Sequence, residues 1–582
     1  MKSRSCRVVL DSQNVDTPAE ISNQASDTKT SLIAKIGWGT LIVVTLYVCY
    51  FSHLGAIGFV GPDEPRYAWI ARDMMESGDW ITPRLYGKPW FEKPPLFYWA
   101  AGLCFKWLGV SETAARLPSA ISALLATLAL AWLALRWYGA ETARWLLLLL
   151  PTTVGMIGFS HAAATDMPFS AMLTIAMVCA AVILGLTRNE NTPILRRTPW
   201  FALVLFGLVL GLAVLAKGPA AIILCGGAVF FWALFTKRWR DAFRLLHPAA
   251  IVSFCVTALP WYFLCARRNP DFFRVFIIEH NFKRYVTPEF QHIQPFWFYV
   301  PVLLVAFLPW TALLLWSLFE GAVQLWRTRS TSHSTLFLLC WAGFCAAFFS
   351  ISQSKLPGYV LPAVPAIATL LSSLYVSRAS AHQKSFRLAM LSAVFLFAVL
   401  IAILATITPH VLRGHERLGV IAGTVIGLMG ISNLFLVVLG QRTVFRFSHG
   451  LVVVLPILAA VVLSKNLVNS YFYWDPSGKT IARELQLRKT PVDQLAVANI
   501  KRGMQYSLSF YLHKEVENWG QANSKKEYVL SSKPSCRTLA PTPFACEPMS
   551  FDEKSTGVFL YHVVMAGSVD GSTGGGQSQQ EE

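Results

Sequence analysis

Two clusters of charged residues follow the first long apolar segment and are the residues best suited to chemistry. Segment 61–67 contains Asp63 and Arg66, and segment 91–96 contains Glu92 and Lys93. Charged groups beside a bilayer lose part of their hydration, so they often mark a functional site. A carboxylate near a guanidinium could act as a general base, and an ammonium on a proline-stiffened backbone could bind a phosphate.

Each cluster also has a structural interpretation. Asp63 could cap a helix that has Pro65 in its first turn, while Arg66 could orient Asp63 or bind a phosphate. Glu92 could ligate a metal or fix Lys93, and Lys93 could instead extend from the interface to water beside a counterion. The residue types alone leave these alternatives open.

Later segments add charged residues between apolar runs. Asp166 could cap a helix with Pro168 in its first turn, or it could face the same side as Asp63. Lys355 and Tyr359, one turn apart, could clamp a phosphate or anchor a helix at the lipid headgroups. Lys217 precedes a Gly-Pro turn, and we interpret it as structural.

The loop 266–295 offers a further cation and a possible metal ligand. Arg284 is a candidate for phosphate binding. His280 could join Glu92 at a zinc site, although the spacing does not require a metal and a loop histidine is more often a hydrogen-bonding residue.

The composition indicates a membrane protein. The 582 residues are 54% hydrophobic and 14% charged, well below the roughly one quarter charged that is typical of soluble domains. The net charge of +18 does not indicate nucleic-acid binding, because the basic residues lie mostly in short gaps between apolar runs. Such charges orient membrane helices and attract anionic lipids.

The hydropathy pattern predicts an all-α polytopic membrane protein with a small α/β or α+β domain at its C-terminal end. A span needs about 20 apolar residues. The thirteen predicted spans are 34–55, 115–136, 144–161, 167–186, 200–216, 218–235, 247–265, 296–318, 335–351, 358–377, 387–408, 418–439 and 449–465.

Basic residues in alternate gaps place residues 1–33 in the cytoplasm, so residues 466–566 are expected outside. We predict no cleavable signal peptide. The transmembrane part is 34–465, and its first outer loop, 56–114, is expected to contain interfacial helices, one near 95–108. Residues 567–582 are expected to be disordered.

Two cysteines fall in the expected outer domain. In an oxidising periplasm Cys536 and Cys546 could form a disulfide, and two unpaired buried thiols are the alternative. Neither interpretation bears on the chemistry of the charged clusters.

The charged segments together resemble those of a known enzyme class. Segments 63–67, 90–96, 165–166 and 355–362 resemble, in order and spacing, the lipid A aminoarabinose transferases. These are relatives of the protein O-mannosyltransferases within the GT-C class of membrane glycosyltransferases. The resemblance covers residues 34 to 465, and the remaining C-terminal region is only loosely similar.

The resemblance implies a donor sugar, such as aminoarabinose or mannose, on a polyprenyl phosphate, and inverting transfer at the periplasmic face of a bacterial inner membrane. The acceptor would be lipid A, another glycolipid, or Ser/Thr of exported proteins. Asp63 would activate or orient the acceptor, with Arg66 and Asp166 lining the same cavity. The donor phosphate would be held by Lys93, Arg284, Lys355 and Tyr359. Glu92 and His280 would form a metal site, with zinc the possible metal.

Two features depart from the aminoarabinose pattern. The loop 266–295 bears histidines where a more acidic loop is usual, and Gly358 stands where a larger residue is common. Both departures bear on the identity of the sugar and of the acceptor more than on the type of reaction. A secondary transporter is a distant alternative, because the charged residues are expected at the outer ends of the membrane helices. In addition, the two halves of the sequence do not repeat each other. A non-catalytic scaffold would leave the charged clusters unexplained.

Overall fold

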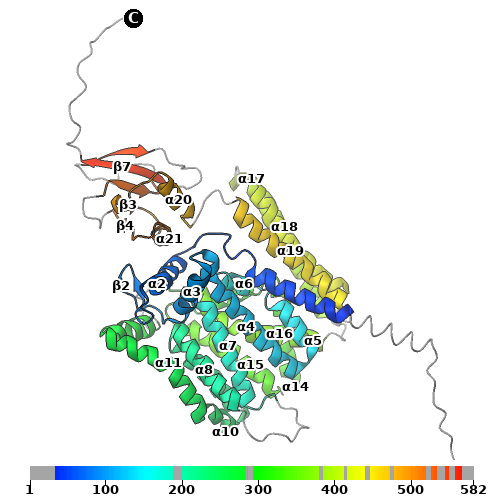
Figure 1. Ribbon diagram of the computed structural model, residues 1–582. Coiled ribbons are helices and arrows are strands. Elements are labelled where there is room, and N and C mark those ends of the chain that lie inside the picture. The colour runs from blue at the N-terminus through cyan, green and yellow to red at the C-terminus, as the bar shows by residue number, and fades with distance from the viewer. Residues whose placement is uncertain are drawn as a thin grey trace, which may run out of the picture.

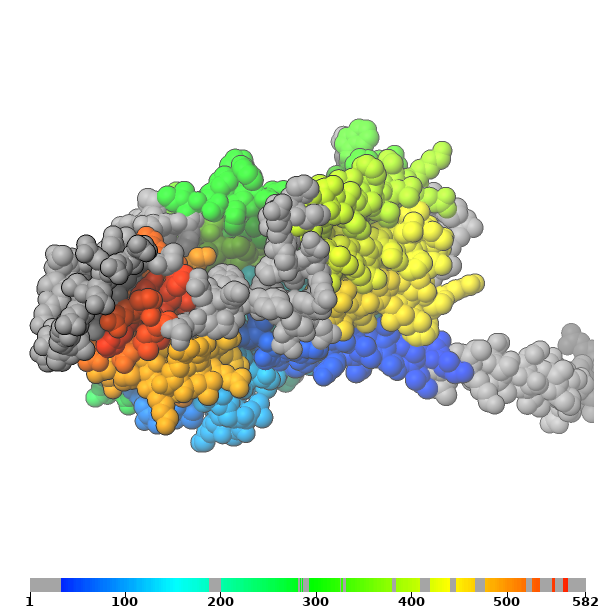
Figure 2. All heavy atoms as spheres, turned by 90° about the horizontal axis from the view of Figure 1, so that it is seen from above, coloured from blue at the N-terminus to red at the C-terminus, as the bar shows by residue number. Residues whose placement is uncertain are grey.

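A computed structural model describes residues 33–187, 200–283, 285, 293–328, 331–378, 384–411, 416–439, 446–471, 477–519, 526–533, 544–549 and 558–565. A large body of packed helices carries a small domain with a β-sheet near its N-terminal loop region (Figure 1). The helices α17–α19 lie together beside the first helix, and the sheet domain lies toward the other end of the molecule (Figure 2). The expectations for residues 1–32, for 567–582 and for Cys536 fall outside the described residues.

Ten helices of the described residues are long and apolar enough to cross a membrane, or twelve if two bent pairs each count as one span. The ten comprise Ile33–Phe51, whose last turn is the π-helix η1 (Tyr47–Phe51), α4 (Glu112–Tyr138), α7 (Asp166–Ile183), α8 (Trp200–Lys217), α11 (Pro248–Arg268), α15 (His333–Ile351), η5 (Pro357–Ala363) with α16 (Val364–Ser377), α17 (Lys384–Val411), α18 (Glu416–Leu439) and α19 (Phe447–Tyr471). The apolar helix α9 (Ala220–Thr236) corresponds to the remaining predicted span. The polytopic all-α class is thereby confirmed.

Two predicted spans are broken rather than straight. Predicted span 144–161 is α5 (Ala140–Leu149) and α6 (Val154–Ser160), bent by 62°, and predicted span 296–318 is α13 (Tyr299–Ala306) and α14 (Thr311–Thr328), bent by 119°. Hydropathy does not detect such breaks, because both halves are apolar.

The breaks have a physical cause and lie against each other. Pro151 and Pro309 fall in the two breaks, and proline cannot continue the helical hydrogen bonds. The Val154 amide donates to the Leu308 carbonyl at 3.0 Å, and the Trp310 indole donates to the Thr152 hydroxyl at 2.9 Å. A backbone amide that lacks a helical partner at one break thus donates to a backbone carbonyl at the other.

The first loop region forms helices and a short hairpin. It contains α2 (Asp63–Ser77), the strands β1 (Arg84–Leu85) and β2 (Lys88–Pro89), and α3 (Leu96–Leu108). As the sequence predicts, Pro65 lies in the first turn of α2 and Gly78 ends it, with a φ of 73° that favours glycine. The short apolar α3 matches the expected helix near 95–108.

Further short elements connect the helical body. They are α10 (Trp239–Ala242), η2 (Phe243–Leu246) and the π-helix η3 (Arg274–Lys283).

The C-terminal domain is a mixed sheet with two helices. Its elements are α20 (Lys479–Leu487), η7 (Val492–Gln494), β3 (Leu495–Ala498), α21 (Arg502–Leu512), β4 (Glu517–Asn518), β5 (Tyr528–Ser531), β6 (Phe544–Met549) and β7 (Phe559–Met565). The strand order is β4-β3-β5-β7-β6, in which β3 is parallel to β4 and β5 and the other pairs are antiparallel. The expected mixture of helix and strand is confirmed.

Candidate active site

The first charged cluster lies at the start of α2. The helix has Pro62 at its N-cap, so Asp63 does not cap it, and the Asp63 carboxylate instead pairs with the Arg66 guanidinium. Arg66 also donates to Glu92 at 3.0 Å and to the Pro62 carbonyl at 2.8 Å. The Arg66 side chain is 8% exposed, whereas that of Asp63 is 46% exposed. The Asp63 carboxylate is therefore held by Arg66 on one side and accessible to solvent on the other.

Glu92 joins the two predicted clusters into one. Its carboxylate contacts both Arg66 and Lys93, the latter at 3.8 Å, and the Lys93 side chain is only 12% exposed. The contact and the burial favour the interpretation that Glu92 fixes Lys93.

Aromatic rings enclose Arg66. Its guanidinium carbon lies 5.9 Å from the ring centre of Tyr67, 5.5 Å from Trp90 and 5.4 Å from Tyr506 of the C-terminal domain. Burial alone would lower the pKa of Arg66, but Glu92, Tyr67 and Asp63 more than offset this, and the pKa is raised. Arg66 therefore keeps its charge at any working pH.

Two buried tyrosines line the inner side of this cluster. The rings of Tyr67 and Tyr98 lie 5.8 Å apart, and both side chains are essentially inaccessible to solvent. Burial, reinforced by Glu92, raises the pKa of both hydroxyls well above the ordinary value. They remain neutral neighbours of the charged groups.

Glu64, next to Asp63, belongs to a different arrangement. Arg116 of α4 donates to both Glu64 oxygens at 2.9 and 2.8 Å, and the amides of Val60 and Ala163 donate to the same carboxylate at 2.9 and 2.7 Å. Arg116 also donates to the carbonyls of three loop residues, Leu54, Ile57 and Gly58. This buried pair fixes the loop before α2 and the turn before α7.

A second charged pair lies where α7, α8 and η5 meet. The N-cap of α7 is Thr165, so Asp166 is not the cap, and its carboxylate accepts from Lys217 at 2.5 Å. The Lys217 ammonium also lies 4.4 Å from the ring centre of Tyr359. Asp63 and Asp166 thus belong to two separate ion pairs.

Gly358 makes room for the second pair. A Cβ at this position would lie 2.6 Å from the Asp166 carboxylate oxygen and 2.8 Å from the Phe159 ring. Glycine at this position therefore avoids a clash with both Asp166 and Phe159.

Lys355 is held by backbone in this structure. Its ammonium donates to the carbonyls of Gln294 and Ser352 at 2.9 and 2.6 Å, and the side chain is buried. The cation that lies over Tyr359 is Lys217 rather than Lys355. Arg284 lies outside the described residues.

Glu92 and His280 line one cavity of about 450 Å³, together with Asp271 and two arginines, Arg268 and Arg274. In the described part of the chain, no three His, Cys, Asp or Glu side chains gather closely enough to hold a metal ion. Zinc sites normally take three or four protein ligands. The cavity fits the pairing of Glu92 with His280 but does not by itself form a zinc site.

The sequence analysis does not anticipate three residues that pair with or pack beside the predicted ones. Lys217 was interpreted as part of a tight turn, although it is a lone lysine at the end of an apolar helix, which is itself a signal. Arg116, inside an apolar span, carries the same signal. Tyr506 has none, because its place beside Arg66 depends on how the C-terminal domain packs.

Comparisons with known proteins identify relatives of this chain. The model of the dolichyl-phosphate-mannose-protein mannosyltransferase family matches residues 38–276. The undecaprenyl phosphate-alpha-4-amino-4-deoxy-L-arabinose arabinosyl transferase of Edwardsiella ictaluri is 32% identical over 447 residues, covering 75% of this chain and 78% of the relative. The enzyme of the same name from Erwinia tasmaniensis is 32% identical over 358 residues, covering 61% of this chain and 62% of the relative.

The same fold occurs in a solved structure. The crystal structure of ArnT from Cupriavidus metallidurans bound to undecaprenyl phosphate superposes with a TM-score of 0.75 at 24% identity, covering 90% of this chain and 98% of that chain. The GT-C fold expected from the sequence is thereby confirmed. Given the long match to the Edwardsiella relative, the chain is a multi-pass membrane glycosyltransferase that belongs to the undecaprenyl phosphate-alpha-4-amino-4-deoxy-L-arabinose arabinosyl transferase family.

Proposed function

We propose that this enzyme transfers 4-amino-4-deoxy-L-arabinose, or a closely related sugar, from undecaprenyl phosphate to lipid A, with inversion, at the outer face of a bacterial inner membrane. The observation that carries the proposal is the half-exposed Asp63 carboxylate held by a buried Arg66 beside Glu92 and Lys93. The names of the relatives supply the donor and the sugar class.

In the proposed reaction, the bond between the anomeric carbon and the donor phosphate breaks while an acceptor oxygen bonds to the same carbon from the opposite side. Asp63 orients the acceptor group and takes its proton where the group carries one. Undecaprenyl phosphate leaves, and the cations Lys93 and Lys217 stabilise the negative charge that grows on it. Tyr359, beside Lys217, and Arg284 are the further proposed phosphate contacts.

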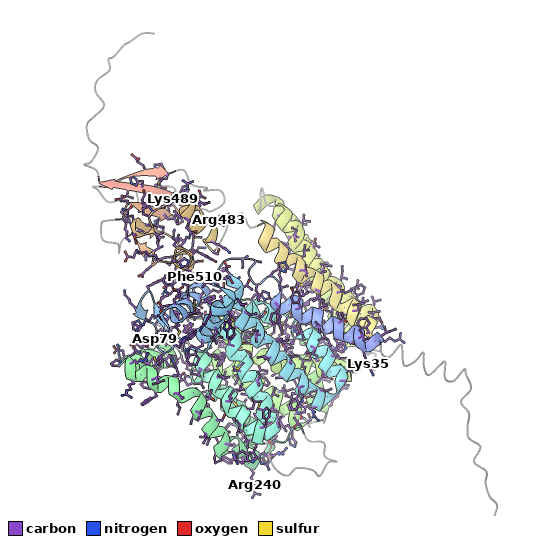
Figure 3. All side chains as sticks on the ribbon, viewed as in Figure 1. Lys35, Asp79, Arg240, Arg483, Lys489 and Phe510 are labelled. Atoms are coloured by element: carbon purple, nitrogen blue, oxygen red, sulfur yellow. The ribbon has the colours of Figure 1, made fainter. Side chains whose placement is uncertain are left out.

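The charge distribution supports the proposed orientation. Arg240, in one of the basic gaps, lies at the end of the molecule opposite the C-terminal domain, to which Phe510 belongs, whereas Asp79 lies nearer to that domain (Figure 3). Since basic gaps favour the cytoplasm, the side bearing Asp63 would face the periplasm.

The test is a transfer assay in proteoliposomes with undecaprenyl-phosphate sugars and a panel of lipid A and peptide acceptors. We expect Asp63→Asn to lower kcat/KM by about 10²–10⁴-fold with a hydroxyl acceptor, in the range of general-base catalysis. Glu76→Gln is the matched control, because this acid is on the same helix and similarly exposed, at 57%.

Equal activity in wild type and Asp63→Asn would remove Asp63 from the mechanism. Transfer to peptides alone would replace lipid A with a protein acceptor, the alternative that the mannosyltransferase family model favours. No transfer from any donor by folded wild type would refute the proposed reaction.

A further inference from the structure

The helix α21 of the C-terminal domain packs directly on the residues that precede Asp63. A Cβ on Gly503 would lie 2.8 Å from the carbonyl carbon of Gly61, so the two backbones are in close contact. The Tyr511 hydroxyl accepts from the Phe59 amide at 3.0 Å and donates to Glu112 at 2.7 Å. The C-terminal domain is therefore joined to the catalytic loop by packing and by directed hydrogen bonds.

One side chain of α21 reaches the catalytic cluster itself. The Tyr506 ring lies 5.4 Å from the Arg66 guanidinium carbon, and it stacks on Tyr86 at 6.4 Å. The Tyr506 hydroxyl accepts from Arg502 at 2.9 Å, which fixes the ring from its outer end. Its neighbours on both sides thus hold the ring in place over Arg66.

We propose that Tyr506 is a positioning residue of the transferase, so that the C-terminal domain completes the catalytic site. This inference rests on the proposed function of Asp63. Arg66 is the partner of both Asp63 and Glu92, and an aromatic face restricts the plane in which its guanidinium can lie. By keeping water from that face, Tyr506 holds Arg66 in the one orientation that aims Asp63 at the acceptor.

The main test compares the steady-state kinetics of Tyr506→Ala and Tyr506→Phe. Loss of the ring is expected to lower kcat about tenfold while KM changes little, because the ring acts on orientation rather than on substrate binding. Tyr506→Phe keeps the ring and is expected to stay within about twofold of wild type. Arg483→Ala is the surface control, since Arg483 lies in the same domain farther from α2 (Figure 3).

A second variant separates positioning from docking. Tyr511→Phe removes two hydrogen bonds that fasten α21 but leaves the ring over Arg66. It is expected to lower the melting temperature more than Tyr506→Ala does, and kcat less. If both variants lowered kcat and melting temperature in parallel, Tyr506 would be a docking residue only.

A double-mutant cycle with Arg66→Lys tests whether Tyr506 acts through Arg66. In the Arg66→Lys background, Tyr506→Ala is expected to change kcat by less than about twofold, because the planar guanidinium is already gone. A full tenfold loss in both backgrounds would overturn the inference. Loss of activity in Asp63→Asn together with wild-type kinetics in Tyr506→Ala would overturn it while leaving the proposed function intact, and inactive wild type would overturn both.

Discussion

The Asp63 region (Asp63, Arg66, Glu92 and Lys93) and the Glu64 region (Glu64, Arg116, Val60 and Ala163) differ sharply. Yet Asp63 and Glu64 are neighbours in the first turn of α2. Glu64 accepts four hydrogen bonds, two on each oxygen, from Arg116, Val60 and Ala163. That number fills the lone pairs of a carboxylate. Asp63 pairs with Arg66 on one side and remains 46% exposed.

The difference shows how a fold separates structural from reactive acids. Successive residues on a helix point about 100° apart, so Glu64 turns toward α4 while Asp63 turns away from it. A saturated carboxylate cannot receive a substrate without breaking the fold, whereas a half-exposed one can. We therefore expect the Glu64 region to govern stability and the Asp63 region to govern turnover.

Breaking the Glu64 region should produce the largest effect on folding. Arg116→Met leaves Glu64 buried without its countercharge, which typically costs about 3–5 kcal/mol. We expect a much lower melting temperature in detergent and a poor yield of folded protein, whereas Asp63→Asn should melt like wild type.

The double variant Arg116→Met/Glu64→Leu is the control, because removing both charges avoids the isolated buried carboxylate. It should recover part of the lost stability. An Arg116→Met protein that melts like wild type but has lost all transfer would contradict the comparison and place Arg116 in the reaction.

The pair of Asp166 and Lys217 lies between these two extremes, with exposures of 21% and 11%, and Gly358 provides a way to displace it. In Gly358→Ala the new methyl group would meet the Asp166 carboxylate at 2.6 Å. We expect kcat to fall by about tenfold, since small displacements of aligned groups can cost up to roughly 100-fold. Melting temperature should fall modestly, because both the Asp166 carboxylate and the Phe159 ring must shift to admit the methyl group.

Gly343→Ala is the matched control, since no atom lies within 4 Å of a Cβ at that helical position. Alanine favours a helix over glycine, so this variant should be active and equally or more stable. Wild-type kinetics in Gly358→Ala would show that the placement of Asp166 does not limit transfer.

The sequence predicted the elements that hold these residues better than it predicted their partners. Apolar length and turn residues located α2, α3 and the spans, because burial in lipid imposes a strong local pattern. The residues Asp63, Glu92 and Asp166 could be chosen by type, but pairing depends on which helices touch. Nothing in the sequence near Lys217 indicates Asp166 as its partner, and nothing near Tyr506 indicates Arg66. The proline breaks were missed because hydropathy averages over them.

The smallest expected effect concerns the contact of α21 with α2 at Arg72 and His513, whose hydrogen bonds involve neither Glu64 nor Arg116. Arg72 donates to the Phe510 carbonyl at 3.1 Å and lies 3.2 Å from the His513 ring nitrogen. Burial first, and then the charge of Arg72, lowers the pKa of His513 below its ordinary value of 6.5. A neutral His513 can accept from Arg72, whereas a protonated one repels it.

Because the folded pKa is lowered, the contact contributes fully above pH 6.5 and is lost as the pH falls through the lowered value. We expect backbone hydrogen exchange in α21, corrected for the intrinsic pH dependence, to rise by about two- to threefold between pH 7.5 and 5. Exchange in α4 around Arg116 should not follow, since that pair has no histidine partner among its hydrogen bonds. His513→Gln should remove the dependence by keeping a neutral acceptor, and His562→Gln on the distant strand β7 should preserve it. An equal rise of hydrogen exchange in α4 would mean that the two regions loosen together. The difference between the structural Glu64 and the reactive Asp63 would then be limited to the two side chains and would not include the helices around them.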